Sequence, residues 1–345
     1  MKISVALASY NGEKYIKEQL ESILNQSVQV DEIVVSDDGS KDSTVEIVRA
    51  FNDSRIVLLQ DNVNHGYTGN FEHALKHTTG DIILLSDQDD VWMPNKVERH
   101  LSVFESNPEV GLVIASGTII DENGNDITNK QTELSLNPQL RISQSCIIPR
   151  KEFLSTAALY CLANGMCMSL ARSFLETSLP FPYSSIGHDV WIGFNALNTS
   201  TVFYLCENLV KYRLHSFNAS KWSNNVSFIQ RFKRSLIRTY NEPYSFFNLS
   251  ICSLAHLDNS SQDDESAIRA CKSKKEISYK QIKALESNFF SGIINLIKLK
   301  LFDAKYKETG RNYFIAQVLF LLLRRFLFSK KQLSNKCLTP NDLIS

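Results

Sequence analysis

Short apolar runs alternate with amphipathic stretches through the first part of the chain. Four runs have the length and the residue types of buried parallel strands, namely residues 3–8, 32–36, 56–59 and 81–86. Between them, apolar residues at helical spacing predict helices over residues 13–26, after Ser43 and around Phe71–Leu75. This alternation predicts an α/β fold with a mostly parallel sheet flanked by helices.

The pattern becomes less regular beyond residue 110. The strands predicted in this part are residues 112–115, 164–170 and 201–205. A helix is predicted from Gly187 to Leu197, after the break at residues 180–182 (PFP). Residues 121–125 (DENGN) predict a hairpin turn, whereas residues 126–157 predict no regular element.

Polar side chains follow three of the predicted strands directly. Residues 9–11 (SYN) follow the first strand, Asp37–Asp38 follow the second, and residues 86–92 (SDQDDVW) include the end of the fourth. The carboxyl ends of parallel strands lie on one edge of a sheet, which is where open α/β sheets bind their ligands. The sequence therefore predicts one polar site built from three strand ends.

The acidic cluster has the chemistry of a metal site. Asp87 and Asp89 point the same way in an extended segment, so both can present oxygens to one cation. Mg²⁺ or Mn²⁺ held by one or two carboxylates completes its shell with water and phosphate, which predicts a metal–diphosphate site. A turn followed by a helix cap is the alternative. An EF-hand loop, suggested by Glu98 at the twelfth position, fails because Val91 and Trp92 replace a ligand and the glycine.

Composition limits the class of protein. The 345 residues, of which 43% are hydrophobic, suffice for one large domain with an appendage or for two domains. Residues 1–224 hold 17 lysines and arginines against 27 aspartates and glutamates, whereas residues 225–345 hold 20 against 10. This asymmetry predicts an acidic catalytic part and a basic tail that faces an anionic partner.

Other sequence features favour a cytoplasmic protein without a dinucleotide site. The seven cysteines are scattered and form no CxxC pair, as expected of reduced thiols. The N-terminus is apolar only to Ala8, too short for a signal peptide, and no run has the length of a membrane span. Neither G-x-G-x-x-G nor a P-loop motif occurs.

Five motifs, in this order, resemble family 2 of the inverting glycosyltransferases, which have the GT-A fold. They are residues 8–11 (ASYN), 37–40 (DDGS), 86–92 (SDQDDVW), 188–191 (HDVW) and 212–215 (YRLH). The resemblance implies a nucleotide-sugar transferase domain over residues 1–222 and leaves residues 223–345 as a basic, mostly helical extension. The third motif, with residues 93–96 (MPNK), is most similar to bacterial rhamnosyltransferase-like enzymes of surface polysaccharide synthesis, such as O-antigen or capsule.

The resemblance implies a set of donor-site residues. The nucleotide-binding residues are Ala8, Ser9, Tyr10, Asn11, Asp38 and Asp87. Asp38 matches the carboxylate that accepts the N3–H of uracil or thymine, and Tyr10 matches the aromatic residue that packs on the base. Asp87 approaches the ribose and the metal. Asp89 matches the ligand of the Mn²⁺ or Mg²⁺ that bridges the diphosphate, and His215 matches a further metal or phosphate contact.

The resemblance also implies an acceptor side. Asp189 stands where the family has its general base, which accepts the proton of the acceptor hydroxyl. His188 departs from the Glu-Asp pair usual in the family, and either adjusts the base or touches the acceptor. Trp191 and Arg213 complete the predicted acceptor-side residues, and Arg213 alternatively pairs with phosphate oxygens.

The implied function is metal-dependent, inverting transfer of a sugar, with rhamnose as one candidate, from a UDP- or dTDP-sugar to a saccharide acceptor that is lipid-linked. Two alternatives stay open: a nucleotidyltransferase, whose related sheet uses similar carboxylates, and a non-catalytic subunit that binds nucleotide or carbohydrate. The first would have a basic glycine-rich loop after the first strand, and residues 9–13 (SYNGE) are not one.

The basic tail carries two amphipathic stretches. Residues 228–240 combine an apolar and a basic stripe, and the apolar stretch at residues 313–323 precedes Arg324–Arg325 and Lys330–Lys331. These stretches predict peripheral contact with the anionic inner face of the cytoplasmic membrane. The alternative is a helical pair that packs on the catalytic domain. Nucleic-acid binding is not expected, because the tail contains no motif for it.

Overall fold

The computed structural model describes two compact units. The described residues are 1–61, 63–127, 142–157, 161–182, 186–215, 218, 249–250, 253–255, 257, 264–286 and 295–296. The first unit comprises Met1–Pro182 and Gly187–Ser223, and the second comprises Tyr183–Ile186 and Asn224–Ser345. The first unit contains the whole sheet and every predicted site residue.

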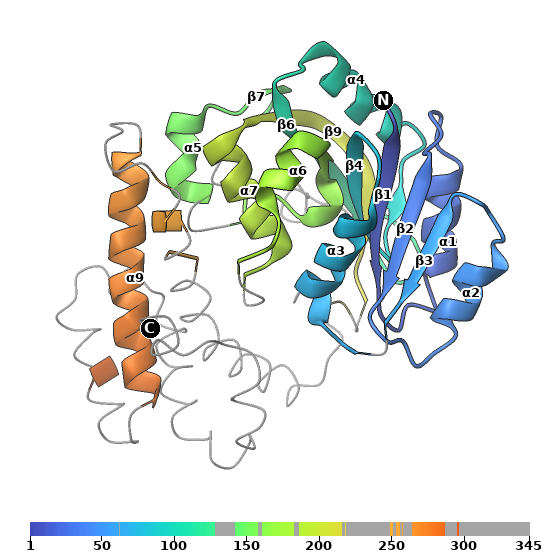
Figure 1. The fold of residues 1–345 in the computed structure, drawn as a ribbon, viewed down its shortest axis with the longest axis horizontal. Coiled ribbons are helices and arrows are strands. Elements are labelled where there is room, and N and C mark those ends of the chain that lie inside the picture. Colours follow the sequence, from blue (N-terminus) through green and yellow to red (C-terminus); the bar gives the residue numbers. More distant parts are fainter. Residues whose placement is uncertain are drawn as a thin grey trace. The chain divides into compact units, whose positions relative to one another are not determined.

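Four parallel strands form one half of the sheet in the order β3-β2-β1-β4 (Figure 1). They are β1 (Ile3–Ser9), β2 (Glu32–Asp37), β3 (Ile56–Gln60) and β4 (Ile82–Asp87), which confirms the four predicted strands. Ala8 lies opposite Ser36 on one side and Asp87 on the other. This register places the polar strand ends next to one another at a single edge.

The other half of the sheet is mixed. It continues from β4 through β8 (Met168–Ala171), β6 (Val110–Ile120) and β9 (Thr201–Arg213) to β5 (Val91–Trp92), and β7 (Cys146–Ile147) pairs with β9. β8 runs antiparallel to both of its neighbours, whereas β6 and β9 are parallel. β9 is much longer than predicted and carries residues 212–213 within the sheet. The turn predicted at residues 121–125 is present, closed by a bond from the Asp121 N–H to the Asn125 carbonyl (2.9 Å).

Helices cover both faces, as predicted. The helices of the first unit are α1 (Ile16–Leu24), α2 (Thr44–Ala50), α3 (Gly66–His77), α4 (Lys96–Ser106), α5 (Arg150–Ala157), α6 (Arg172–Ser178) and α7 (His188–Thr199), with a 3₁₀ turn, η1 (Gly165–Cys167). In Figure 1, α3 lies on one side of the strands β1 to β3, and α1 and α2 lie on the other side. The helices α4, α5 and α6 were not predicted, and the expectation of no regular element in residues 126–157 is wrong, because β7 and α5 lie there.

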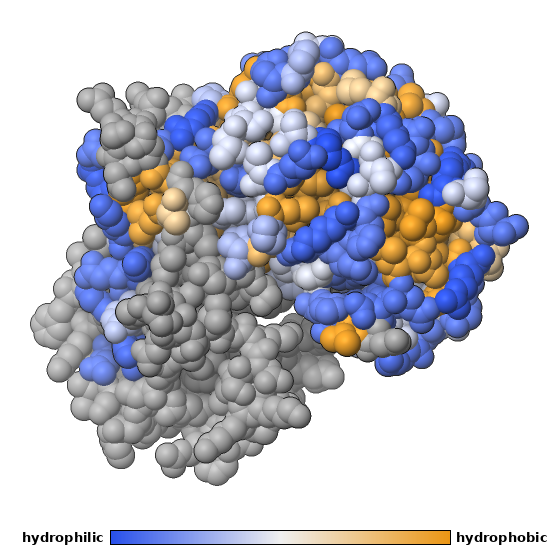
Figure 2. Space-filling model, in the orientation of Figure 1, coloured by the Kyte–Doolittle hydropathy of each residue, from blue (hydrophilic) through white to orange (hydrophobic). Residues whose placement is uncertain are grey.

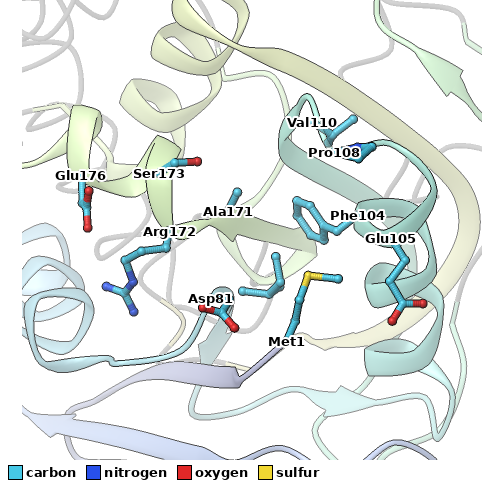
Figure 3. Close-up of a pocket in the computed structure, with 11 residues that line it drawn as sticks. Met1, Asp81, Phe104, Glu105, Pro108, Val110, Ala171, Arg172, Ser173 and Glu176 are labelled. Atoms are coloured by element: carbon cyan, nitrogen blue, oxygen red, sulfur yellow. The ribbon is translucent and has the colours of Figure 1, made fainter.

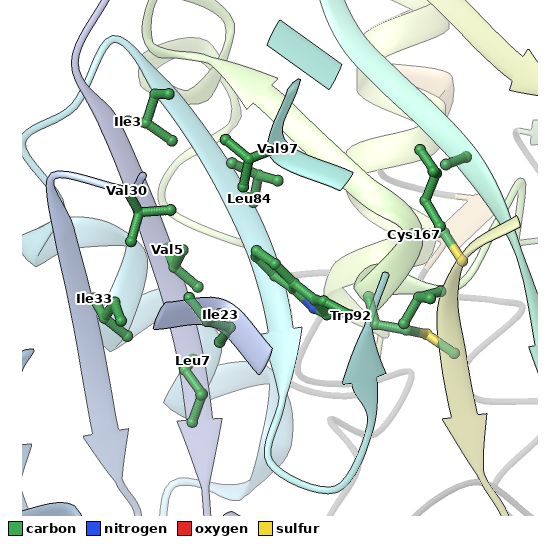
Figure 4. Packing of buried hydrophobic residues seen from close by; sticks show 14 of the residues in the cluster. Ile3, Val5, Leu7, Ile23, Val30, Ile33, Leu84, Trp92, Val97 and Cys167 are labelled. Carbon is green, nitrogen blue, oxygen red and sulfur yellow. The ribbon is translucent and has the colours of Figure 1, made fainter. Parts of the chain in front are cut away.

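Strand alternation and helical spacing build the core. Ile3, Val5 and Leu7 of β1 are buried against α1, where Ile16 and Leu20 are fully buried. Figure 4 shows these strand residues converging with Trp92 of β5. Each fully buried aliphatic or aromatic side chain contributes about 1.5–3 kcal/mol of transfer free energy. Apolar residues also gather on the surface over β2 and β3 (Figure 2). β3 is the edge strand at this end of the sheet, and β2 is next to it.

The second unit is described mainly through α9 (Glu265–Glu286). One face of this helix is buried, including Ala267, Cys271, Ser278 and Ile282, at the spacing of an amphipathic helix. The stretches predicted to contact a membrane, at residues 228–240 and 313–331, lie outside the described residues. Within the part of the chain that is described, no helix has both the length and the apolarity that crossing a bilayer requires.

A buried lysine stands at the start of α4. The Lys96 ammonium donates a hydrogen bond to the Met166 carbonyl (2.6 Å) and lies 4.0 Å from the centroid of the Trp92 ring. Burial lowers the pKa of Lys96 to about 8, although the neighbouring Cys167 and Asp90 oppose the change. The protein therefore buries an amine that is charged below this pH and neutral above it.

The lowered pKa of Lys96 predicts a pH-dependent stability. Between pH 8 and the unfolded-state pKa of about 10.4, the unfolded chain binds the proton that the folded chain has lost, so stability rises with pH. Relative to Lys96→Met, the wild type should gain about 2 kcal/mol between pH 7.5 and 10. Urea unfolding measures the difference, with Lys17→Met as the exposed control. A difference that stays constant with pH would contradict the buried ammonium.

Candidate active site

The ends of β1 and β2 are tied together by buried hydrogen bonds. The Ser9 hydroxyl donates to Asp37 Oδ2 (2.9 Å), and the Asp38 N–H donates to the Ser9 carbonyl (2.9 Å). Asp37 also accepts the Ser40 N–H (2.9 Å), which closes the turn after β2. The predicted residues Ser9 and Asp38 are therefore brought together, and Asp37 is the buried residue that fixes them.

Asp38 connects the end of β2 to the start of α3. Its Oδ1 accepts the His65 N–H (2.7 Å) and its Oδ2 accepts the Gly66 N–H (2.9 Å). Burial raises the pKa of Asp38, and these two backbone bonds oppose the increase. The carboxylate thus caps the turn into α3, and its predicted contact with a nucleobase stays a prediction.

Gln88 joins the loop after β1 to the loop after β4. Its Oε1 accepts the Tyr10 N–H (2.8 Å) and its Nε2 donates to the Tyr10 carbonyl (3.0 Å), so one side chain satisfies both backbone groups. The Tyr10 ring is left exposed (45%), as a ring that packs on a base would be. A Cβ at Gly12 would clash with the Gln88 carboxamide, so a larger residue at this position would displace the side chain that bonds Tyr10. Asn11 lies beside them, and its N–H donates to the Ser40 hydroxyl (2.8 Å).

Asp89 and His215 meet although 126 positions separate them in the chain. Asp89 Oδ2 lies 2.7 Å from His215 Nε2 and 3.3 Å from Asn218 Nδ2. Both Asp89 and His215 are buried, and the Tyr15 ring lies 4.7 Å from the imidazole, centroid to centroid. The two predicted metal-side residues therefore converge, and Asn218 joins them without having been predicted.

This pair suits a magnesium or manganese ion. Within the described residues, no group of three or more His, Cys, Asp or Glu side chains is arranged to hold a metal. Two protein donors are nevertheless the set expected where diphosphate oxygens and water complete an octahedral shell. The negative charge of the cluster also favours a bound cation, because a cation would relieve the repulsion between Asp87 and Asp89. When bound, such an ion would neutralise charge on a departing diphosphate.

Asp87 ends β4 among other carboxylates. Burial, followed by the charges of Asp89 and Asp189, raises the pKa of Asp87 to about 7, and Lys96 opposes the increase. Burial, followed by the charges of Asp89 and Asp87, raises the pKa of the fully buried Asp90 well above its usual range. The effect of Asp189 on the pKa of Asp87 indicates that Asp189, on α7, lies near the acidic edge of the sheet.

Arg213 holds the acidic loop in place. Its N–H donates to Asp90 Oδ1 (3.0 Å) and its Nε donates to the Asp89 carbonyl (3.0 Å). The guanidinium also pairs with Glu18 Oε2 (2.6 Å) and lies 4.9 Å from the centroid of the Tyr15 ring. Arg213 is buried (2% exposed). These contacts give it a structural function beneath the predicted metal residues, and its predicted contact with the acceptor or with phosphate oxygens stays a prediction.

Asp189 lies in the first turn of α7, as predicted. Gly187 precedes the helix, and Asp189 Oδ1 accepts the Val190 N–H (2.8 Å). A helix N-terminus favours a negative charge, because unpaired N–H groups and the helix dipole point toward it. The side chain is half-buried, so a carboxylate is kept accessible near Asp87.

His188 and Trp191, predicted on the acceptor side, are buried instead. His188 stacks on Phe71 of α3 (3.9 Å between centroids), and a Cβ at Gly165 would clash with its ring. Among the described residues, neither of its ring nitrogens has a hydrogen-bond partner, and burial lowers its pKa. Trp191 donates from Nε1 to the Ser178 carbonyl (3.0 Å) and is 4% exposed. Helical periodicity explains Trp191, which lies on the face of α7 that packs on α6.

A cavity lies at the opposite edge of the sheet. It has a volume of about 660 Å³ and is lined by Asp81, Phe104 and Arg172, among others (Figure 3). Asp81 precedes β4, whereas Asp87 ends it, so the cavity and the acidic loop lie at opposite ends of one strand. None of the predicted site residues lines this cavity.

Comparisons with known proteins agree with this geometry. Residues 4–163 match the model of the family described as "Glycosyl transferase family 2". The fold is thus the GT-A fold. The matched residues 4–163 make up somewhat less than half of the chain, and over them the chain is similar to glycosyl transferase family 2.

Two bacterial relatives illustrate the similarity. "Uncharacterized glycosyltransferase alr2836" of Nostoc sp. is 29% identical over 225 residues, which cover 63% of this chain and 66% of the relative. "UDP-Glc:alpha-D-GlcNAc-diphosphoundecaprenol beta-1,3-glucosyltransferase WfgD" of Escherichia coli is 29% identical over 232 residues, covering 66% and 83%. A third, "Putative glycosyltransferase EpsE" of Bacillus subtilis, is 34% identical, but the match spans only 45% of its length.

Solved structures share the fold at low identity. TarS 1-349 of S. aureus, crystallised in complex with UDP, has a TM-score of 0.58 and 16% identity, with coverage of 94% of this chain and 91% of TarS. The mannosyltransferase PcManGT of Pyrobaculum calidifontis, in complex with GDP-Man and Mn²⁺, has a TM-score of 0.53 and 16% identity, covering 94% and 88%. At such identity the likeness establishes the fold alone.

The contacts of Arg213 predict a stability effect. Arg213→Met should lower the free energy of unfolding by about 2–3 kcal/mol, because it removes charged hydrogen bonds and leaves buried acceptors unpaired. Glu18→Gln is the matched control: it keeps an acceptor oxygen at a half-exposed position and should change stability little. Urea unfolding measures both. An unchanged stability of Arg213→Met, with only the acceptor KM altered, would instead support the acceptor-side assignment.

Proposed function

We propose that this chain is a metal-dependent, inverting glycosyltransferase that moves a sugar from a UDP- or dTDP-sugar to a saccharide carried on a lipid diphosphate. The observation that carries the proposal is the convergence of three groups at one edge of a GT-A sheet. These groups are the Asp89–His215 pair, the carboxylate of Asp87, and Asp189 at the start of α7.

The donor side follows from the tied strand ends. Tyr10 presents an exposed ring beside Asp38, which suits a base that packs on one side and hydrogen-bonds on its edge. Asp89 and His215 would hold a Mn²⁺ or Mg²⁺ ion against the diphosphate. Asp87, next to them, would approach the ribose. Ala8, Ser9 and Asn11 shape the loop that holds these groups together.

The acceptor side follows from Asp189. Inversion requires a base on the face opposite the leaving group, and an accessible carboxylate at a helix N-terminus meets this need. The hydroxyl oxygen of the acceptor would give its proton to Asp189 while it bonds to the anomeric carbon, and the diphosphate would leave with the electron pair of the broken bond.

A lipid-linked acceptor is supported by one relative and by the charge distribution. The Escherichia coli relative is named for transfer from UDP-Glc to a GlcNAc-diphosphoundecaprenol. The basic residues after position 225 suit peripheral contact with an anionic membrane that holds such an acceptor. A lipid-linked acceptor at the membrane favours a function in O-antigen or capsule synthesis, with rhamnose among the candidate sugars.

The alternatives make different predictions. A nucleotidyltransferase would release pyrophosphate from a nucleoside triphosphate, and a non-catalytic binding subunit would leave a nucleotide sugar intact. The intact Asp89 and Asp189 favour transfer over silent binding. Slow hydrolysis of UDP-sugars that depends on manganese would separate transfer from both alternatives.

Metal dependence is tested by binding as well as by turnover. We expect UDP with Mn²⁺ to raise the melting temperature of the wild type, because a ligand that binds only the folded state stabilises it. Asp89→Asn should lose the Mn²⁺-dependent part of this shift, whereas Asp81→Asn, at the other end of β4, should keep it. Undiminished sugar transfer in excess chelator would refute the metal dependence.

The function of Asp189 is tested by Asp189→Asn. Asparagine has nearly the same size and caps a helix about as well, but it cannot accept a proton. Transfer to a synthetic N-acetylglucosaminyl diphospholipid should therefore fall by roughly a hundredfold to ten-thousandfold. The melting temperature and the UDP–Mn²⁺ shift should stay nearly unchanged. Near-normal turnover would make Asp189 a structural cap and leave the base unassigned.

A further inference from the structure

Tyr67 is an exposed aromatic residue in the first turn of α3. It follows Gly66, whose N–H is bonded to Asp38, so the backbone on its N-terminal side is fixed to the end of β2. The side chain nevertheless keeps 53% of its surface exposed. An amphipathic ring left open on a tightly held turn is available to a ligand without a large ordering cost.

The surroundings of Tyr67 place it beside α7. Its ring centroid lies 6.3 Å from that of His188, at an interplanar angle of 66°. One helical turn further along α3, the Phe71 ring stacks on the same His188 ring, with 3.9 Å between the centroids. His188 is held from behind by Gly165, where no Cβ would fit. The buried pair Phe71–His188 therefore supports Tyr67, which is the exposed member of the group.

Asp189 lies within electrostatic reach of Tyr67. Although about half of the residue is exposed, desolvation of the phenol group, and next the charge of Asp189, raises the pKa of Tyr67. The Tyr67 ring contacts His188, which directly precedes Asp189 at the start of α7, so Tyr67 lies on the same side of the site as Asp189.

We propose that Tyr67 is a specificity-determining residue whose ring packs against the C–H face of the acceptor saccharide while a hydroxyl of that sugar meets Asp189. The proposal rests on the proposed function. Pyranose rings present axial C–H groups that suit the negative face of an aromatic ring, and tyrosine combines this face with a polar edge. Because the acceptor hydroxyl must lie within about 2.6–3.2 Å of the base, the attached sugar ring is confined to its immediate neighbourhood.

Three variants separate the ring from the hydroxyl and from the helix. Tyr67→Ala removes the aromatic ring on which the acceptor sugar would pack, here called the platform, and Tyr67→Phe keeps this ring without its hydroxyl. His77→Ala alters an exposed ring on the same helix, ten residues or about 15 Å further along. The probe is methyl α-N-acetylglucosaminide, observed by saturation-transfer NMR in the presence of UDP and Mn²⁺.

We expect saturation transfer to the ring protons of the probe in the wild type, Tyr67→Phe and His77→Ala. The signal should fall at least about fivefold in Tyr67→Ala. With the synthetic diphospholipid acceptor, Tyr67→Ala should raise the acceptor KM about tenfold, which corresponds to about 1.4 kcal/mol, while the donor KM changes less than about twofold. Tyr67→Phe should restore the acceptor KM.

Equal spectra for the wild type and Tyr67→Ala, including no transfer in either, would overturn the assignment. A raised donor KM with an unchanged acceptor KM would overturn it as well. The UDP–Mn²⁺ melting shift distinguishes these results from failure of the proposed function. If the shift is present in all variants, the donor site is intact and only the platform is in question. If it is absent from the wild type, both proposals fail.

Discussion

The acidic edge of the sheet depends on a buried arginine. Asp87, Asp89 and Asp90 lie within four positions, and burial of this many carboxylates is unfavourable unless cations or donors offset their charge. Arg213 supplies both, through its backbone N–H to Asp90 and its guanidinium near the Asp89 carbonyl. The loop can therefore hold several negative charges close together, and a bound cation would neutralise the part of this charge that Arg213 does not offset.

The topology of the sheet explains how these groups meet. β9 runs parallel to β6 for most of its length and pairs with β5, so the end of β9 arrives beside the loop that follows β4. Arg213 is the last residue of β9, and His215 follows two positions later, just outside the strand. A single strand thus provides the structural support of the loop and a donor to its Asp89, from more than a hundred residues away.

Much of this could be predicted from the sequence, because it depends on local periodicity. The four parallel strands, the helices between them and the common edge of their ends follow from patterns that span a few residues. The antiparallel strand β8 and the burial of Trp191 and Arg213 could not be predicted in this way. They depend on which faces meet in three dimensions, and an arginine or tryptophan near a motif has the same local pattern whether it faces the site or supports it.

The structural function of Gln88 could not be predicted for a related reason, because a glutamine within an acidic motif gives no local signal. Its carboxamide occupies both backbone groups of Tyr10, much as a neighbouring strand would, so the loop after β1 and the loop after β4 are joined as one rigid piece. A displacement of either loop is transmitted to the other. The aromatic ring and the acidic residues are therefore thermodynamically linked, and whatever factor a cation adds to the affinity for a nucleotide, the nucleotide must add to the affinity for the cation.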